Sequence, residues 1–397
     1  MKGKILIFIL VALMLTRMAL AAHFIVGIVN NARDGTLANG HTVVLWNPAN
    51  GIEDNLTDII GPSGNSGADN IYMLDCEMLQ TECGIGNEIR VRVINNGDDY
   101  ITSFVNSSVT GAGYDLMENL ILNSPPNITS VVVDDSIVIP ENEIDLIAAS
   151  NRKVTCEAIV SDLDTQLFQN ATAEFFDSAI SYYNDLDDNN KHYTNDSCYI
   201  NESYGGENEA RVICDFQIGY YANSEEWKCV LRVEDNLSIS NNNSDLTFIN
   251  SLLSIGAVSI IDLGVVSGGV VSDELEINIT NFGNIMINLS LSGYAVSEGD
   301  NLSMNCTLGS LKNISINYEK YNLTASNPGA LTLSQFEAVY INLTSSPVVK
   351  RFGLNYRQND AENEALNSTY WRIYVPVGVA GSCSGNIVFG ASQAAGI

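Results

Sequence analysis

Two cysteines, Cys156 and Cys229, constrain the fold more than any other feature of this 397-residue chain. Each lies in a run of alternating apolar and polar residues, KVTCEAIV (153–160) and EWKCVLRVED (226–235), and each belongs to the apolar set. Alternation with a period of two predicts a strand with one buried face. Because both cysteines belong to buried faces, a bridge between them would join two facing sheets, as in a β-sandwich.

The eight cysteines as a set predict a disulfide framework. An even number of cysteines in an exported chain favours disulfides. Sequence order and strand parity suggest the pairs Cys76–Cys83, Cys156–Cys229, Cys198–Cys214 and Cys306–Cys383. Closing the long 306–383 loop would stabilise the fold by roughly 4–5 kcal/mol in the chain-entropy model. A zinc site is the alternative, but the chain has only 3 histidines and no C-x-x-C motif.

The N-terminal segment predicts export. Residues 1–22 read MKGKILIFILVALMLTRMALAA, with Lys2 and Lys4 before an apolar core and an A-x-A box at 19–21, the layout of a secretory signal peptide. A transmembrane anchor is the alternative, but the apolar run before Arg17 is too short to span a bilayer. A type IV prepilin leader is another, in which Lys4 would interrupt the start of the apolar stem. We expect a mature chain without a transmembrane anchor.

Composition and charge exclude several classes of protein. The chain has 47 acidic and 18 basic residues, and loss of the leader, with its three cations and no acids, would move the formal charge from −29 to −32. Such a charge favours solubility and disfavours nucleic acid as a partner. Disorder is also disfavoured because 46% of the residues are hydrophobic.

Sixteen N-x-S/T sequons predict N-glycosylation. The chain has 46 asparagines, for which chance would give roughly half as many sequons. In ELEINIT (274–280), IMINLSL (285–291) and VYINLT (339–344), alternation puts the apolar residues on one face and the sequon asparagine on the other. The sixteen are Asn55, Asn106, Asn127, Asn170, Asn195, Asn201, Asn236, Asn242, Asn278, Asn288, Asn301, Asn305, Asn313, Asn322, Asn342 and Asn367.

The chain as a whole predicts an all-β protein of tandem β-sandwich modules, Ig-like or transthyretin-like, behind a signal peptide. Short alternating runs and turn dipeptides such as Asn96-Gly97 recur, and helical patterns are few. We expect a signal peptide at 1–22 and modules at 23–124, 125–247 and 248–397. Pro125-Pro126 would form a stiff linker before the second module.

The first module resembles the carboxypeptidase regulatory-like domain, also called transthyretin-like or CnaB-like. The resemblance implies a sandwich of seven or eight strands that serves as a stalk, a spacer or a carbohydrate-contact unit. Some relatives carry Lys–Asn crosslinks, but this module has no lysine between Lys4 and Lys153. The matching features are Gly27, Asp34-Gly35, Asn39-Gly40 before residues 43–45, a glycine-rich loop before Tyr72, and Gly86 before residues 89–93.

The other two modules resemble domains of archaeal secreted surface proteins. The stretch ARVICDFQIGYYANSEEWKCVLRVEDN (210–236) is similar to Ig-like domains, although Trp227 is the only tryptophan between the paired cysteines and an insertion carries Cys198 and Cys214. The ending YWRIYVPVGVAGSCSGNIVFG (370–390) is similar to the last sandwich of such proteins. Its residues Trp371, Ile373 and Val375 are expected to face inward.

The sequence contains no recognisable catalytic motif. His23, His41 and His192 lie in no evident pairing with a nucleophile, and no G-x-S-x-G, H-E-x-x-H, P-loop or G-x-G-x-x-G is present. A pair of carboxylates suited to glycoside hydrolysis stays open because acids are abundant. We predict a protein that is not an enzyme.

One loop has the spacing of a calcium site. In DLDDNNKHYTND (185–196), Asp185, Asp187, Asn189 and Asp196 take positions 1, 3, 5 and 12 of a calcium loop. The loop lacks Gly at position 6 and Glu at position 12, so a solvated acidic loop is the alternative. Structural Ca²⁺ is the only cofactor that the sequence suggests.

Three functions stay open for an extracellular protein at a cell surface. The first is a structural component of a surface layer, stalk or filament; the second is an adhesin for glycans or a partner cell, with calcium; the third is an accessory part of a secreted hydrolase. Partners would be other surface proteins, glycans or further copies. FIVGIV (24–29) pairs within its own module or adds to a sheet of a neighbouring copy.

Overall fold

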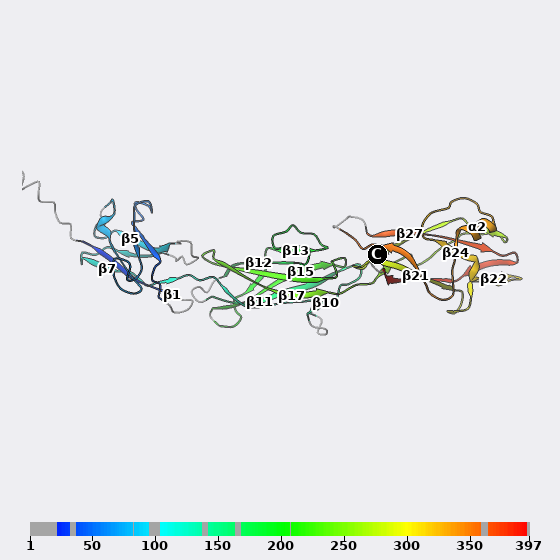
Figure 1. The fold of residues 1–397 in the computed structure, drawn as a ribbon, viewed down its shortest axis with the longest axis horizontal. Helices are drawn as coiled ribbons and strands as arrows, with labels where there is room; N and C mark the ends of the chain where they lie inside the picture. Colours follow the sequence, from blue (N-terminus) through cyan, green and yellow to red (C-terminus); the bar gives the residue numbers. More distant parts are fainter. Residues whose placement is uncertain are drawn as a thin grey trace, which may run out of the picture.

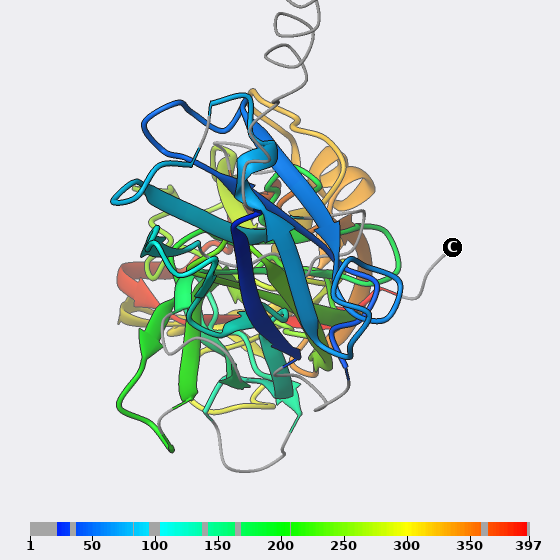
Figure 2. The same ribbon diagram turned by 90° about the vertical axis from the view of Figure 1, so that its left-hand side faces the viewer.

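The computed structural model describes residues 22–31, 37–81, 83–94, 104–136, 142–162, 168–206, 208–358 and 364–394. The protein is all-β, and three sandwich modules follow one another along an elongated molecule (Figure 1); the end-on view of Figure 2 shows them one behind another. The leader (1–21), Asp34-Gly35 and Asn96-Gly97 lie outside the described residues. Within these ranges, no helix is long and apolar enough to cross a membrane.

The first module closes two four-stranded sheets over one core. One sheet has the order β4-β1-β7, with β8 also pairing β1, and the other has the order β3-β2-β5-β6. The core draws on both sheets, with Ile25, Leu45 and Ile89 among its fully buried residues. The elements are β1 (Phe24–Asn31), β2 (Thr42–Trp46), β3 (Asn55–Ile59), β4 (Ile71–Asp75), η1 (Cys76–Met78), β5 (Glu88–Ile94), β6 (Val105–Ser108), β7 (Tyr114–Leu116) and β8 (Leu120–Leu122).

Strand β1, which contains FIVGIV, is central in its sheet. It pairs antiparallel with β4 and parallel with β7 and β8. Both of its edges are therefore hydrogen-bonded within the module, and the interpretation of this segment as a strand added to a neighbouring copy is wrong. Gly27 is required at the centre of β1 because a Cβ there would lie 2.2 Å from the hydroxyl oxygen of the buried Tyr72 on β4.

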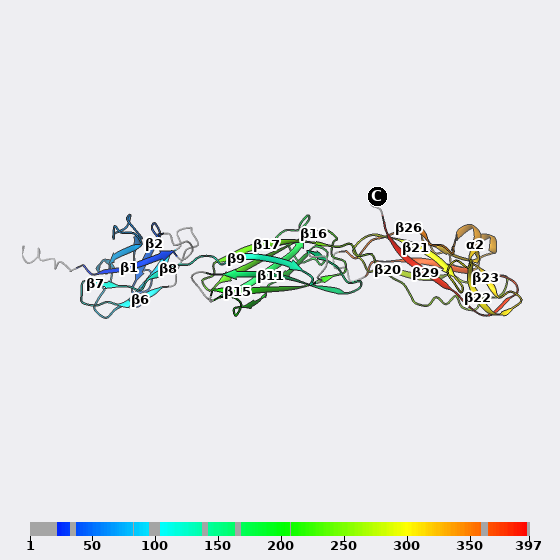
Figure 3. The ribbon, with the colours of Figure 1, turned by 90° about the horizontal axis from the view of Figure 1, so that it is seen from below.

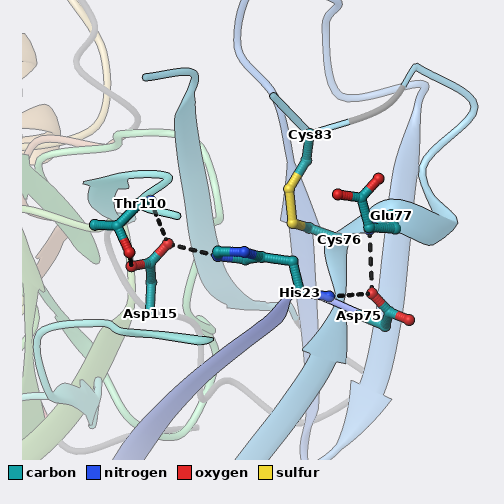
Figure 4. The surroundings of a disulfide bond; sticks show 7 residues. All are labelled: His23, Asp75, Cys76, Glu77, Cys83, Thr110 and Asp115. Carbon is teal, nitrogen blue, oxygen red and sulfur yellow. Dashed lines mark hydrogen bonds and ion pairs between the residues drawn. A yellow bond between two sulfur atoms is a disulfide. The ribbon is translucent and has the colours of Figure 1, made fainter. Parts of the chain in front are cut away.

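His23 fixes the start of β1 (Figure 4). Its Nε2 lies 2.7 Å from Oδ2 of Asp115, and its backbone N–H donates to Oδ1 of Asp75 at 3.1 Å. Asp115 also accepts hydrogen bonds from the backbone N–H of Thr110 at 2.8 Å and from its hydroxyl at 2.6 Å. Burial raises the pKa of Asp115, but the hydrogen bonds from Thr110 and His23 outweigh burial and hold this pKa below its ordinary value.

The second module faces the sheet β14-β15-β11-β9 toward the sheet β10-β17-β16-β12-β13. The Cys156–Cys229 disulfide joins β11 to β16 and therefore joins the two sheets, as predicted. Trp227 is fully buried, with its ring centroid 4.8 Å from that of Phe175. The strands are β9 (Asn127–Asp134), β10 (Glu143–Ile144), β11 (Asn151–Ser161), β12 (Phe168–Asp177), β13 (His192–Asn195), β14 (Tyr199–Asn201), β15 (Glu209–Gly219), β16 (Glu226–Asp235) and β17 (Ser240–Ile249).

The third module contains three sheets. Their orders are β18-β20-β27-β24-β25, with β19 also pairing β27, then β26-β21-β29 and β23-β22-β28; β21 and β29 lie side by side in Figure 3. The elements are β18 (Ile255–Gly256), β19 (Val270–Val271), β20 (Leu275–Asn281), β21 (Ile287–Tyr294), β22 (Leu302–Gly309), β23 (Asn313–Ser315), η2 (Ile316–Tyr318), β24 (Glu319–Asn322), α2 (Leu333–Val339), β25 (Ile341–Asn342), β26 (Val348–Leu354), β27 (Leu366–Val375), β28 (Val379–Ser384) and β29 (Asn386–Gln393).

The run VYINLT (339–344) is not the half-buried strand that its alternation predicted. Its first residue ends α2, and Ile341 is 40% exposed. Of the three apolar residues expected to face inward, only Leu343 is buried, whereas Tyr340, expected on the other face, is buried as well. The cause is local: Thr332 and Gln335 form a capping box at the start of α2, and the buried Phe336 anchors this helix. Because α2 extends to Val339, β25 begins only at Ile341 and is two residues long.

The cysteines form four disulfides, in the four pairs expected from sequence order and strand parity. Cys76–Cys83 closes a turn in the first module (Figure 4), and Cys198–Cys214 links the start of β14 to β15. Cys306 and Cys383 lie directly opposite each other on β22 and β28. Each module therefore has at least one covalent crosslink.

The Asp115 carboxylate gives the first module a testable acid sensitivity. Because its folded-state pKa lies below the unfolded value of about 3.9, its interactions stabilise the fold above about pH 4 and are lost as the pH falls through the folded-state pKa. We expect Asp115→Asn to lower the free energy of unfolding by about 1–3 kcal/mol at pH 7 and by less at pH 3. Urea denaturation at both pH values measures this. The exposed Glu118→Gln is the control, and an equal deficit at both pH values would contradict the assignment.

Candidate functional site

The loop between β12 and β13, residues 178–191, is the most distinctive surface of the second module. It exposes four large side chains: Ile180 is 58% exposed, Tyr182 70%, Tyr183 37% and Leu186 90%. Large apolar side chains gathered in the open mark sites of interaction with other molecules. We therefore treat this loop as the candidate functional site.

The first turn of the loop is fixed by the last residue of β12. Asp177 is 1% exposed, and its Oδ1 accepts the backbone N–H of Ala179 at 3.0 Å. Its Oδ2 accepts Nδ2 of Asn223 at 2.9 Å. At the other end, the backbone N–H groups of Lys191 and His192 both donate to the carbonyl of Asp188 at 2.7 Å. Both ends of the loop are thus held by hydrogen bonds to buried or partly buried groups.

A buried polar cluster lies under the middle of the loop. His192 is 0% exposed; its Nδ1 lies 3.0 Å from Oγ of Ser181, and its Nε2 lies 3.4 Å from Oε2 of Glu174. The same Glu174 oxygen accepts the backbone N–H of Asn184 at 2.6 Å. The Ser181 hydroxyl donates to Oδ2 of Asp185 at 3.1 Å. The cluster ties β12, β13 and the exposed loop together.

Ser181, His192 and Glu174 are the residue types of a hydrolytic triad, but their arrangement does not support nucleophilic catalysis. The nucleophile of a triad donates its proton to the histidine, whereas the Ser181 proton points to Asp185. With that proton given to Asp185, a hydrogen bond between Ser181 Oγ and Nδ1 of His192 requires the tautomer with a proton on Nδ1. Ser181 is also only 1% exposed, so a substrate has no access to it. We infer that the cluster holds the loop in one conformation.

The structure does not gather the predicted calcium ligands, Asp185, Asp187, Asn189 and Asp196. Oδ2 of Asp185 accepts the backbone N–H of Tyr182 at 2.8 Å, and Oδ1 of Asp187 accepts the hydroxyl of Thr194 at 2.7 Å. Across the described ranges, no group of three or more His, Cys, Asp and Glu side chains could hold a metal ion. The first two carboxylates accept hydrogen bonds from neighbouring N–H and O–H groups, so the structure gives the calcium site no support, and it stays a prediction.

The sequon asparagines all reach the surface to some extent. None of the sixteen is buried; twelve are exposed, and Asn195, Asn201, Asn288 and Asn322 are partly exposed. Many of them have hydrogen-bonded side chains: for example, Oδ1 of Asn288 accepts the backbone N–H of Phe352 at 2.9 Å, and Oδ1 of Asn342 accepts Nζ of Lys320. N-glycosylation stays a prediction for all sixteen.

Sequence reasoning missed the exposed side chains of the loop. The calcium-like spacing concerns only acidic and amide residues such as Asp185 and Asp187. It predicts no role for the adjacent Tyr182, Tyr183 and Leu186. Two tyrosines and a leucine without alternation, in a segment otherwise rich in Asp and Asn, fit neither a strand nor a solvated loop. This departure from both patterns is the sequence signal that could have identified the loop as an interaction surface.

No protein-family model and no curated protein matches the chain. Among solved structures, it is similar to BcpA, the major pilin subunit of Bacillus cereus, with 8% identity over 82% of this chain and 94% of that chain and a TM-score of 0.30. It is also similar to the T6 backbone pilin of serotype M6 Streptococcus pyogenes, with 7% identity, 92% and 94% coverage and a TM-score of 0.27. The major pilin SpaD from Corynebacterium diphtheriae gives 11% identity, 68% and 72% coverage and a TM-score of 0.28. Scores this low support no conclusion about function.

The buried cluster predicts how the loop responds to mutation. Ser181→Ala removes the acceptor of the His192 Nδ1–H and the donor to Asp185, and we expect it to cost about 1–3 kcal/mol of unfolding free energy. Amide hydrogen exchange in residues 178–191 should become faster while β11 and β15 keep their protection. The exposed Asp187→Asn is the matched control, expected to stay within about 0.5 kcal/mol of the wild type. Unchanged exchange in Ser181→Ala would show that the cluster does not order the loop.

Proposed function

We propose that the chain is an exported, N-glycosylated structural protein of a cell surface, acting as a stalk or as a component of a filament or surface layer. The observation that carries this proposal is the linear order of three disulfide-crosslinked sandwiches with hydrogen-bonded junctions (Figure 1). A stalk or filament component needs a constant end-to-end length. Whether the three modules form a rigid rod therefore depends on the rigidity of the two junctions between them.

The junction between the second and third modules is centred on Asn284. This residue is 1% exposed, and its Nδ2 donates to the carbonyls of Ala222 at 3.0 Å and Asn250 at 3.1 Å. Its Oδ1 accepts the backbone N–H of Leu252 at 2.7 Å. A single side chain of the third module thereby binds the segment before β16, at Ala222, and the segment after β17, at Asn250 and Leu252.

Further contacts surround this centre. Nδ2 of Asn190 donates to the carbonyl of Arg357 at 2.9 Å, and the hydroxyl of Tyr356 donates to Oδ1 of Asn223 at 3.0 Å. The Arg357 guanidinium lies 4.6 Å from the ring centroid of Tyr221. A buried amide whose hydrogen bonds are all made holds one geometry, and Asn284 makes three such bonds across the junction, so we infer that the junction is stiff.

The first module is also tied to the second at the level of side chains. Nδ2 of Asn123, which is 2% exposed, donates to Oδ2 of the buried Asp235 at 2.7 Å. The half-buried Pro125 and the buried Pro126 follow directly and restrict the backbone of the linker. These features support a rod in which all three modules keep their order and spacing.

An adhesin is the second candidate function, and the loop 178–191 favours it. The loop is rigidly held, carries no sequon, and exposes two tyrosines beside acidic and amide side chains. Tyrosine offers a large amphipathic contact surface with few rotatable bonds, which suits recognition. A glycan array probed with the intact chain, without added calcium, separates this candidate from a purely structural role.

The stiffness of the junction is testable with one substitution. Asn284→Ala removes three hydrogen bonds and leaves the carbonyls of Ala222 and Asn250 without their donor. Small-angle X-ray scattering should show a shorter average end-to-end dimension and a broader distance distribution than for the wild type. Asn317→Ala, at an exposed position of the third module outside any sequon, is the control for loss of an amide. An unchanged distance distribution in Asn284→Ala would contradict a role of this side chain in the shape of the rod.

Glycosylation is tested by peptide mapping of protein isolated from its native source. We expect glycans at several of the twelve exposed sequons, Asn278 among them, because these side chains are open to a transferase. Thr280→Ala destroys the sequon of Asn278 without touching the asparagine and should remove that glycan alone. If all sixteen asparagines were found unmodified, the glycoprotein part of the proposal would be wrong, while the structural part would stand on the scattering data.

A further inference from the structure

The third module contains a cavity that neither proposed function uses. Its volume is about 450 Å³, and it lies between the segment 258–263 and residues 383–387, which run from the end of β28 to the start of β29. Met304, Glu319 and Phe389 contribute to its lining. Apolar side chains such as Ile261, Leu263 and Ile387 form part of its wall, Ser259, Asp262, Ser384 and Asn386 add polar groups, and Glu319 supplies one buried carboxyl group.

The Glu319 side chain faces this cavity. Glu319 on β24 lies opposite Ile373 on β27, and directly opposed residues of an antiparallel pair share a face of the sheet. Ile373 packs in a cluster together with Leu263, Met304 and Cys383, and these three also line the cavity. The carboxyl group is therefore directed into the same space as these side chains.

The Glu319 carboxyl group has no partner within the described part of the chain. Glu319 is 3% exposed, and burial alone raises its pKa to about 8, with no hydrogen bond or neighbouring charge acting on it. Placing an unpaired acid in apolar surroundings is costly. Lys320, its neighbour in sequence, points to the opposite face and contacts Asn342 and the ring of Phe336. The cavity thus holds a buried acid that has no partner among the described residues and that burial keeps in its protonated form at neutral pH.

The two walls of the cavity also have backbone groups that are free to bond. Strand β29 pairs with β21 along one edge, and no described strand pairs with its other edge. Residues 258–263 belong to no strand and make no backbone hydrogen bond to another described residue. An extended segment entering between them could bond to such groups, which is recognition by β-augmentation.

We propose that this cavity binds a lysine side chain presented by an extended segment of a partner protein. The apolar walls suit the four-carbon stem of lysine, its ammonium group would pair with Glu319, and the flanking main chain of the partner would bond to β29 and to the segment 258–263. The excess of acidic residues attracts basic partners in general. The inference goes beyond the proposed function, since it holds for a stalk and for an adhesin alike.

The test uses the mature chain and a pair of blocked heptapeptides of alternating threonine and valine. One peptide carries lysine at the centre, and the other carries norleucine, which keeps the stem and removes the charge. Isothermal titration calorimetry should give a Kd at least about tenfold lower for the lysine peptide. The affinity should rise between pH 6 and pH 8, because below about pH 8 Glu319 must lose a proton before it pairs with the ammonium group. In buffers of different ionisation enthalpy, the measured binding enthalpy should change in the way expected for the release of this proton.

Variants of the protein complete the test. Glu319→Gln should reduce the affinity for the lysine peptide to that of the norleucine peptide, while the exposed Glu298→Gln should leave it unchanged. Glu298 has no part in the cavity lining. If Glu319→Gln fails to fold, the peptide pair and the proton release on the wild type decide the question. Equal binding of both peptides would show a strand site without lysine recognition, and no binding of either would show a closed cavity; both outcomes overturn the proposal.

Discussion

The position of strand β16 between the two junctions is the constraint on which the arrangement of the modules depends. At its N-terminal end, the carbonyl of Ala222 and the side chain of Asn223 bond to the third module through Asn284 and Tyr356. At its C-terminal end, Asp235 bonds to Asn123 of the first module. Ten residues of strand cover about 33 Å, so one continuous strand spans the central module from one junction to the other.

The Cys156–Cys229 disulfide acts on this same strand. It ties the middle of β16 to β11 in the opposite sheet, and Trp227 packs beside it against Phe175. A pull along the molecule enters the second module at β9 and leaves it at β17. Strand β16 pairs with β17, and the disulfide joins β16 to β11, the neighbour of β9, so β16 links the two loaded strands. The covalent link to the second sheet keeps the strand from sliding out of the core, which suits the stalk or filament role proposed above.

The parts of the fold that depend on local patterns could be predicted from the sequence. Period-two alternation around Cys156 and Cys229 gave the correct buried faces because each strand buries one side and exposes the other. The same logic failed at Ile341, where a capping box and a buried Phe336 favoured a helix just before it. For β1 it gave the strand but could not choose between the two kinds of partner, because the parallel partners β7 and β8 come from about ninety residues further along the chain. Such pairings are set by the packing of the whole module and leave no mark in the segment itself.

The candidate sites could not be predicted from the sequence, because the position of each side chain depends on the fold around it. Glu319 and Lys320 illustrate this. In the sequence they are adjacent charges of opposite sign and read as a neutral pair on a surface strand. Strand geometry places successive side chains on opposite faces, so the two groups cannot pair with each other. Lys320 meets Asn342 and Phe336 on the side of α2, whereas Glu319 meets the apolar cavity. The separation enforced by the strand turns an adjacent pair of opposite charges into one cation with partners and one buried acid without a partner among the described residues, which is the group on which the proposed lysine site depends.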